Sequence, residues 1–473
     1  MPDTARLRPR HADVQRPIIL CPIHFTANDQ TVKPAQAPRK ALAAIAAGTV
    51  AMAAAMWVAG HECLAFWDSD TYIDAFGNIL RDGADAIRTP AYPVLVGLCR
   101  TVFGEALWVY ALMAVQLAAF AATIPAVWRL AARLVPPRAA LVATAVYAWC
   151  PTFVSFTMFV MPDIWCVIGV VALLCAAVRM SEKPGWGAVA RCSVVSVALV
   201  LLKPSNIYIA IWWGVLALAL LCLRDRRWRT CAVPAAAMAA VLGLYGLLVQ
   251  RQTGYYTVSV VSDINDLGNA AQRRKLVPEL APDSATAALF RQINAADTVT
   301  NLRRRQMAFV GTEHLTYAQI HGVMSATKSY DPARWHRGIL VRLFESMPSN
   351  AFPVHGSDGF EYYAGALHVS FYTVYAAILA LMAWLGACTW RRVRLRRGSP
   401  ARAGASAAKG SAAASADRRL LWLWALWVLV CGGIATAVIG GFDDYGRLSM
   451  GAYPALILLC AAAVAPRRDA AAA

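Results

Sequence analysis

Charged residues are scarce in this chain: they make up 15% of its 473 residues, against 59% hydrophobic ones. So little charge, together with a positive mean hydropathy, excludes an ordinary soluble enzyme and indicates a membrane protein with many spans. The twelve cysteines lie mostly inside apolar runs and form no CxxC or Cys/His spacing. The sequence therefore predicts neither a zinc site nor a disulfide framework.

Long apolar runs dominate instead, and a run of about 20 residues can cross a bilayer core about 30 Å thick. Ten runs occur, the fifth of them short: approximately 41–60, 106–128, 139–158, 162–179, 191–203, 205–223, 231–249, 367–389, 420–440 and 449–466. A further apolar piece, 92–103, is too short to span and predicts a helix in the interface. The expected fold is an all-α polytopic membrane protein with about ten transmembrane helices, interfacial helices in the first outer loop and a small extracytoplasmic layer.

The net charge of +18 is explained by topology and does not require a nucleic-acid partner, because cytoplasmic loops of membrane proteins retain Lys and Arg. With both termini inside, the inner segments hold 28 of the 45 basic residues and seven of the 27 acidic ones. The outer segments keep 17 basic and 20 acidic residues. This asymmetry predicts a multi-pass protein of the bacterial inner membrane, with cytoplasmic termini and periplasmic outer loops.

The composition along the chain suggests its domains. Gly, Ala and Ser with few groups to bury fill residues 398–417, which predicts disorder there. Some 40 residues precede the first apolar run, so we expect that run to stay as an anchor and not to be cleaved. The predicted divisions are a disordered cytoplasmic tail 1–40, a transmembrane catalytic half 41–249 with the acidic outer loop 61–105, an extracytoplasmic region 250–366, C-terminal transmembrane helices 367–466 with a disordered cytoplasmic loop 391–419, and a cytoplasmic tail 467–473.

An acidic stretch, residues 61–93, interrupts the apolar sequence directly after the first run. It carries six carboxylates against two arginines: Glu62, Asp68, Asp70, Asp74, Asp82 and Asp85, with Arg81 and Arg88. Charges near hydrocarbon are costly and are usually kept for function, so the stretch indicates chemistry or cation binding. The alternative is a solvated loop whose acids repel anionic lipid.

Five short motifs follow one another along the chain: WDSDTYIDA from residue 67, RTPAYPVLVGL from 88, VMPDIWCVIGVVALL from 160, LVLLKPSNIYI from 199 and FDDYGRLSMGAYPALILL from 442. In this order the chain resembles a GT-C membrane glycosyltransferase of the family 39 type. That group includes protein O-mannosyltransferases and bacterial enzymes that transfer aminoarabinose or other sugars from polyprenyl phosphate. The resemblance covers about 41–250 and 420–466 and leaves 250–366 unassigned.

The resemblance implies an integral-membrane glycosyltransferase that moves a sugar from a polyprenyl-phosphate donor to a lipid A, glycan or protein acceptor outside the cytoplasm. The acceptor hydroxyl then needs a base, and Asp68 is the candidate. The family often has Asp-Glu where this chain has Asp68-Ser69-Asp70, so Asp70 is the candidate in a shifted register. Asp163 is a second catalytic acid, or a carboxylate that complements the start of a helix.

Cations are needed near the departing phosphate, and the candidates are Arg88, Lys203 and Arg447. Arg88 could instead reach lipid headgroups, and Arg447 could pair with the neighbouring aspartates. Tyr72 is a candidate for lining the sugar pocket. No cofactor is required by any ligand spacing, although Asp68, Asp70 and Asp163 together could hold a divalent cation.

Two other classes compete with this interpretation. A polytopic transporter or flippase of lipid-linked sugars would place charges near the midplane on broken helices, often in two related halves. The sequence has its charges at predicted span ends and contains no evident repeat. An O-antigen polymerase or ligase would share the many spans and the outer arginines without requiring the acidic first loop.

Overall fold

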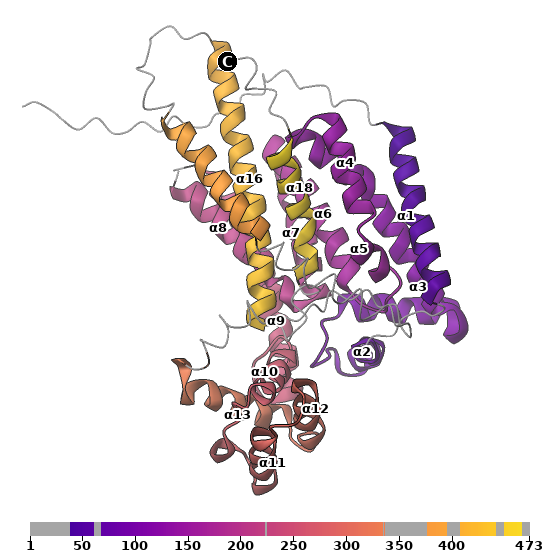
Figure 1. The fold of residues 1–473 in the computed structure, drawn as a ribbon, viewed down its shortest axis with the longest axis vertical. Helices are drawn as coiled ribbons and strands as arrows, with labels where there is room; N and C mark the ends of the chain where they lie inside the picture. The colour runs from indigo at the N-terminus through magenta and orange to yellow at the C-terminus, as the bar shows by residue number, and fades with distance from the viewer. Residues whose placement is uncertain are drawn as a thin grey trace, which may run out of the picture.

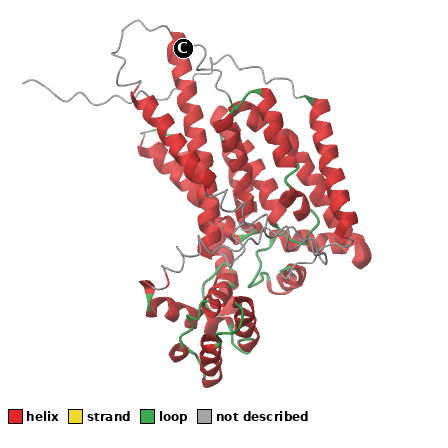
Figure 2. Cartoon of the chain, viewed as in Figure 1, coloured by secondary structure: helices red, strands yellow, loops and turns green. Residues whose placement is uncertain are grey.

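The computed structural model describes residues 38–60, 68–222, 225–333, 335, 376–394, 407–440 and 449–465. Within these ranges every secondary-structure element is a helix, as Figure 2 shows. The prediction of an all-α chain is therefore confirmed for the described residues.

Seven described helices are long and apolar enough to cross a membrane. They are α1 (Arg39–Gly60), α3 (Ala91–Leu134), α6 (Asp163–Glu182), α8 (Tyr208–Cys222) with the 3-10 turn η1 (Pro204–Ile207) before it, α9 (Trp228–Thr253), the helix Ala376–Arg394, and α16 (Ala407–Gly440). Two shorter apolar helices join them, α7 (Trp186–Leu202) and α18 (Tyr453–Val464), the second preceded by η3 (Met450–Ala452). This is the architecture of a helical membrane protein.

The third predicted run, 139–158, is not one helix. It forms α4 (Pro137–Ala148) and α5 (Pro151–Phe156), and Cys150 between them has an extended backbone with ψ 112°. The cause is Pro151, which disfavours the helical conformation of the residue before it. A single uninterrupted span was therefore the wrong prediction for this run.

The disorder predicted for 391–419 also differs from the structure. Residues 391–394 complete the helix that begins at Ala376, and α16 already begins at Ala407. Alanine is the best helix former, and the stretch from Ala407 to Ala416 contains six alanines among its ten residues. This stretch, for which the composition predicts disorder, instead extends the following apolar helix by about three turns.

The predicted interfacial piece 92–103 forms the first part of α3. Helical geometry is broken at Gly104, where φ is 69° and ψ is 170°, a conformation that glycine adopts without a Cβ penalty. In Figure 1 this first part of α3 lies across the lower end of the bundle before the chain turns upward. A short helix, α2 (Ser69–Asp82), lies beside it.

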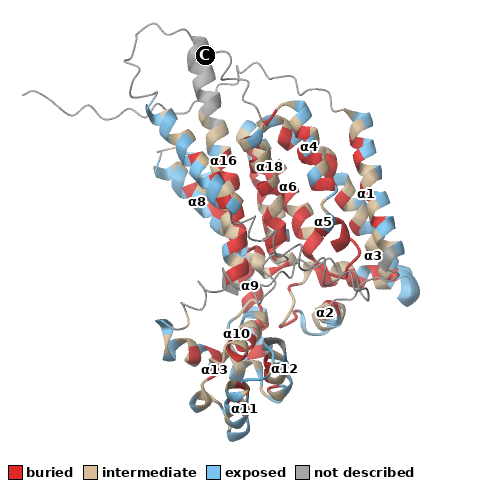
Figure 3. Ribbon diagram, viewed as in Figure 1, coloured by how far each residue is buried: buried red, intermediate tan, exposed pale blue. Residues whose placement is uncertain are grey.

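The core of the bundle is apolar and is centred on α6. Val167, Val170 and Leu173 of this helix are fully buried, and Figure 3 shows the buried positions concentrated on the inner helices. Two buried hydrogen bonds of tryptophan side chains also join helices. Trp212 of α8 donates to the Ala425 carbonyl of α16, and Trp213 donates to Ser196 of α7.

The chain from 261 to 330 folds into a separate helical unit with its own small core. It contains α10 (Val261–Gln272), the 3-10 turn η2 (Pro278–Leu280), α11 (Ser284–Ala295), α12 (Asn301–Gly311) and α13 (Tyr317–Tyr330). Phe290, Ile293 and Met324 are fully buried in this core. We call α10–α13 the extramembrane unit, because the polar composition predicted a layer outside the bilayer here.

The two ends of the bundle differ in what they carry. At one end Arg133 and Glu182, in the last turns of α3 and α6, form an ion pair of 3.0 Å. At the other end lie α2 and the extramembrane unit, as Figure 1 shows. The Val260 amide donates to the Ala86 carbonyl at 2.9 Å, so the first acidic loop and the region after 250 meet. Both loops therefore lie on the same side, as the charge count predicted.

Candidate functional site

Lys203 lies where the chain leaves α7 and enters η1. Its backbone is extended, with φ −156° and ψ 123°, because Pro204 follows it and disfavours a helical conformation. The Lys203 Nζ atom is 2.6 Å from Asp163 Oδ1. The lysine side chain is 10% exposed and that of the aspartate 1%, so this is a buried ion pair. The sequence predicted both residues as site candidates but did not predict that they pair.

Asp163 is the first residue of α6, directly after Pro162. Its carboxylate Oδ1 accepts a hydrogen bond from Lys203 Nζ. The second oxygen, Oδ2, is buried and has no hydrogen-bond partner in the described part of the chain. Burying a carboxylate oxygen without a donor is costly. That oxygen is therefore an acceptor to which a ligand hydroxyl or a water could donate.

A second acid–cation pair is formed by Asp68 and Arg88, at 3.0 Å between Oδ1 and Nη2. Arg88 Nε donates to Thr71 Oγ1 at 2.7 Å, and Nη1 donates to the Tyr72 hydroxyl at 3.2 Å. The guanidinium carbon also lies 4.2 Å from the centre of the Tyr72 ring. With 12% of its side chain exposed, Arg88 turns into the protein and does not reach toward lipid headgroups.

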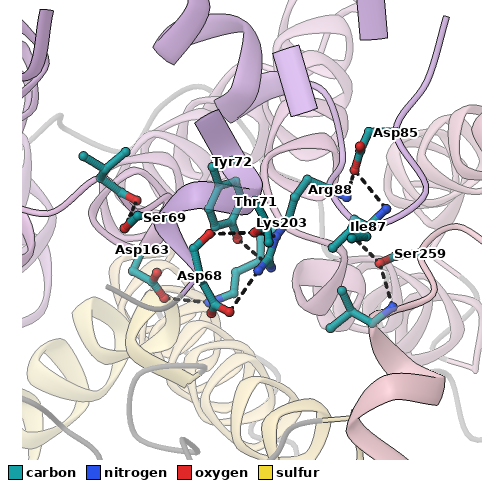
Figure 4. Close-up of polar contacts among 12 residues, drawn as sticks. Asp68, Ser69, Thr71, Tyr72, Asp85, Ile87, Arg88, Asp163, Lys203 and Ser259 are labelled. Carbon is teal, nitrogen blue, oxygen red and sulfur yellow. Dashed lines mark hydrogen bonds and ion pairs between the residues drawn. The ribbon is translucent and has the colours of Figure 1, made fainter. Parts of the chain in front are cut away.

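Tyr72 stands between the two pairs. Burial raises the pKa of its phenol above the usual value, while the charges of Arg88 and Lys203 lower that pKa and those of Asp68 and Asp163 raise it. All four charges are thus close enough to act on one hydroxyl group, and Figure 4 shows their side chains gathered around Tyr72. The phenol keeps its proton at neutral pH and can donate it to a ligand.

The position of Tyr72 is fixed by buried polar contacts behind it. Its ring packs edge-on against Tyr92, with the ring centres 5.3 Å apart. The Tyr92 hydroxyl donates to Gln116 of α3, whose amide donates in turn to the Thr157 and Phe159 carbonyls. The segment before α6 is thereby tied to α3 and to the first outer loop.

The start of α2 is tied to the same segment by Ser69, whose hydroxyl donates to the Val160 carbonyl at 3.1 Å. Asp68 directly precedes Ser69, and Asp163 follows Val160 by three residues. This single buried contact therefore brings together two motifs that lie about ninety residues apart in the sequence.

Asp70 does not join this group, because it is exposed on the outer surface of α2. The described residues contain no group of three or more His, Cys, Asp or Glu side chains that could hold a metal ion. Asp68, Asp70 and Asp163 therefore do not form the divalent-cation site suggested by the sequence. Arg447, the third predicted phosphate contact, lies outside the described residues.

Sequence reasoning missed several residues that build the site. Thr71 and Gln116 hold Arg88 and Tyr92, yet a threonine in a polar loop and one glutamine in an apolar run carry no distinctive pattern. Gln116 offered a weak signal, because an amide inside a membrane span needs partners. Tyr245 of α9, whose hydroxyl donates to the Arg88 carbonyl, lies in an apolar run with no sequence motif that would mark it as a site residue.

Comparisons with known proteins do not extend this picture: no family model, no curated protein and no solved structure matches the chain.

Proposed function

We propose that this protein is an integral-membrane glycosyltransferase of the GT-C type, which moves a sugar from a polyprenyl-phosphate donor to a lipid, glycan or protein acceptor. One observation carries the proposal: two acid–cation pairs meet around the Tyr72 phenol at one end of an apolar helical bundle. A lipid-linked sugar needs this combination, because its tail stays in the bilayer while its phosphate and sugar require charges at the interface. The five motifs that resemble the family 39 enzymes support the same class.

In this proposal Asp68 is the base. It removes the proton from the acceptor hydroxyl as that oxygen forms a bond to the anomeric carbon of the sugar. The bond between that carbon and the phosphate oxygen breaks, and polyprenyl phosphate leaves with the bonding electrons. Asp68 suits the role better than Asp70 because its carboxylate lies 3.0 Å from Arg88, a candidate phosphate contact. The geometry therefore favours the register in which Asp68, and not Asp70, meets the acceptor.

Arg88 and Lys203 are the proposed phosphate contacts, with Arg447 as a third that the sequence suggests. A guanidinium binds phosphate oxygens in a bidentate manner, and a lysine supplies a compact charge. In the absence of donor, the two carboxylates hold these cations in place. Donor binding would exchange Asp68 for a phosphate oxygen at Arg88, which frees Asp68 for the acceptor, while Lys203 stays paired with Asp163. Asp163 and Tyr72 then offer an acceptor and a donor for sugar hydroxyls.

The proposed topology has ten spans, both termini in the cytoplasm and the site on the periplasmic side of a bacterial inner membrane. The separation of the Arg133–Glu182 end from the end that carries α2 and the extramembrane unit supports it. Single cysteines at Asp82 and Asp297 should react with a membrane-impermeant thiol reagent in intact cells. A cysteine at Lys183, at the opposite end, should stay unreacted until the membrane is opened. The reverse pattern would place the site in the cytoplasm.

A transporter or flippase of lipid-linked sugars is the alternative that one observation favours. The Asp163–Lys203 ion pair is buried where α7 joins η1, and buried ionisable pairs in membrane proteins often mark a substrate path. An O-antigen polymerase or ligase gains no support of this kind from the described residues.

The deciding experiment uses the purified full-length protein in liposomes that contain a radiolabelled polyprenyl-phosphate sugar. A glycosyltransferase consumes the donor and releases polyprenyl phosphate in the presence of an acceptor extract. A flippase moves the donor to the other leaflet and leaves it chemically intact. Movement without any consumption would contradict the proposed function.

A further inference from the structure

Five consecutive backbone carbonyls, those of residues 84–88, accept hydrogen bonds from one continuous surface. That surface consists of the outer part of α9 and the residues just before α10. The donors are Gln252 Nε2 to Ala84 at 2.8 Å, Tyr245 OH to Asp85 at 3.1 Å and to Arg88 at 3.0 Å, the Val260 amide to Ala86 at 2.9 Å, and Ser259 Oγ to Ile87 at 2.6 Å. Segment 84–88 is neither helix nor strand, so these bonds replace the ones that regular structure would provide.

Among these donors, Tyr245 contacts both Asp85 and Arg88, the first and last residues of the turn 85–88. Its hydroxyl contacts the Asp85 and Arg88 carbonyls and also accepts from the Asp85 amide at 3.3 Å. A hydroxyl has one proton and two lone pairs, so the two carbonyls share the proton while the amide takes a lone pair. The Tyr245 side chain is buried and packs with Ala84, Ala86 and Val260.

The Asp85 side chain stabilises residues 85–88 by accepting hydrogen bonds from backbone amides of the same segment. Its Oδ1 accepts from the Ile87 amide at 2.9 Å and from the Arg88 amide at 2.6 Å, while Asn78 donates to Oδ2 at 2.8 Å. Figure 4 shows Asp85, Ile87 and Ser259 on the side of Arg88 opposite to Asp68. The backbone of Arg88 is thus fixed on one side while its guanidinium reaches Asp68, Thr71 and Tyr72 on the other.

We infer that Tyr245 is a positioning residue, which aims the Arg88 guanidinium at the site by fixing the backbone of residues 85–88. The inference rests on the proposed function for what Arg88 binds, namely the phosphate of the lipid donor. Arg88 makes three directed contacts through Nε, Nη1 and Nη2, and all three depend on where its Cα lies. A displacement of about 1 Å at such a group is enough to weaken binding and catalysis strongly.

The test compares Tyr245→Phe with the wild type as full-length protein in nanodiscs. Phenylalanine keeps the ring and its packing and removes only the hydroxyl. We expect amide exchange in residues 84–88 to become about tenfold faster, because buried hydrogen bonds to Asp85 and Arg88 are lost. We also expect the donor KM, and the Kd for polyprenyl phosphate alone, to rise about tenfold while the acceptor KM stays unchanged. A mere loss of folded protein would lower the rate and leave both KM values unaltered.

Tyr255→Phe is the matched control. The Tyr255 side chain packs against the same cluster as Tyr245, but its hydroxyl donates to Asp263 at 2.7 Å and to none of the residues 84–88. The same substitution should therefore alter neither exchange there nor the donor KM. A second check combines Tyr245→Phe with Arg88→Ala. If Tyr245 acts through Arg88, the double variant is no worse with the donor than Arg88→Ala alone.

Two results would overturn the inference: unchanged exchange in 84–88 for Tyr245→Phe, or additive losses in the double variant. Failure of the proposed function looks different, because the wild type itself would then transfer no sugar. In that case the exchange rates and the Kd for polyprenyl phosphate still decide whether Tyr245 positions Arg88.

Discussion

The two acid–cation pairs of the site differ most in their access to water. In the Asp163–Lys203 pair the side chains are 1% and 10% exposed, whereas in the Asp68–Arg88 pair they are 35% and 12% exposed. The first joins two helices of the bundle and the second lies within the outer loop. Breaking a buried pair leaves an uncompensated charge, but a partly exposed carboxylate can be solvated when its partner leaves. In the proposed function, therefore, the Asp163–Lys203 pair (the inner pair) stabilises the site, and the Asp68–Arg88 pair (the outer pair) exchanges its carboxylate for the donor phosphate.

The largest effect should come from breaking the inner pair on one side only. Lys203→Ala leaves Asp163 buried without its cation, and we expect a loss of about 3–5 kcal/mol in the free energy of unfolding, together with lost donor binding. Thermal and denaturant unfolding in detergent would measure the first effect. The double variant Asp163→Asn/Lys203→Met should recover much of the stability but no activity. A Lys203→Ala protein as stable as the wild type would mean that the inner pair has no structural role.

A smaller free-energy effect, seen more in the rate than in stability, is expected from the outer pair. Asn keeps the shape of Asp but cannot take a proton as a carboxylate does, so Asp68→Asn should reduce sugar transfer by at least about 100-fold. The unfolding free energy should fall less than for Lys203→Ala, because the Asp68 side chain is partly exposed and Arg88 keeps its hydrogen bonds to Thr71 and Tyr72. Transfer kinetics and unfolding are measured on the same preparation.

Asp70→Asn is the matched control for this substitution, because Asp70 lies two residues away and is exposed on α2. It should retain nearly full activity. If Asp70→Asn is inactive while Asp68→Asn transfers normally, the motif is out of register by two residues and the comparison between the two pairs no longer identifies the base.

The smallest effect concerns Thr71, which links Arg88 to the backbone of Asp68 through hydrogen bonds of 2.7 Å and 2.6 Å. Thr71→Val preserves the branched shape and should cost about 0.5–1.5 kcal/mol in stability, with a several-fold rise in donor KM. Thr101→Val is the control, because the Thr101 hydroxyl donates only to the Gly97 carbonyl of its own helix. Equal donor KM values for the two variants would show that Thr71 does not help to hold Arg88.

Local chemistry explains which parts of the fold could be predicted. Apolar runs of about 20 residues required helices, and Pro162 and Pro204 marked the helix start at Asp163 and the break at Lys203. The two errors were also local in origin. Pro151 disfavours a helical conformation at the residue before it and so interrupts the third run. Alanine favours helix, and the alanine-rich sequence from Ala407 is therefore helical where its composition predicted disorder.

The sequence by itself determined the helical architecture of the described residues, that the two polar regions lie at the same end of the bundle, and which charged residues lie near helix ends. It could not determine which acid meets which cation, because Asp163 and Lys203 are forty residues apart and only the packing of α6 against α7 joins them. Nor could it separate Asp68 from Asp70, since both stand in one acidic stretch and only the orientation of α2 buries one side of it. Pairing and orientation depend on contacts between distant segments, and for that reason the tertiary structure alone decided them.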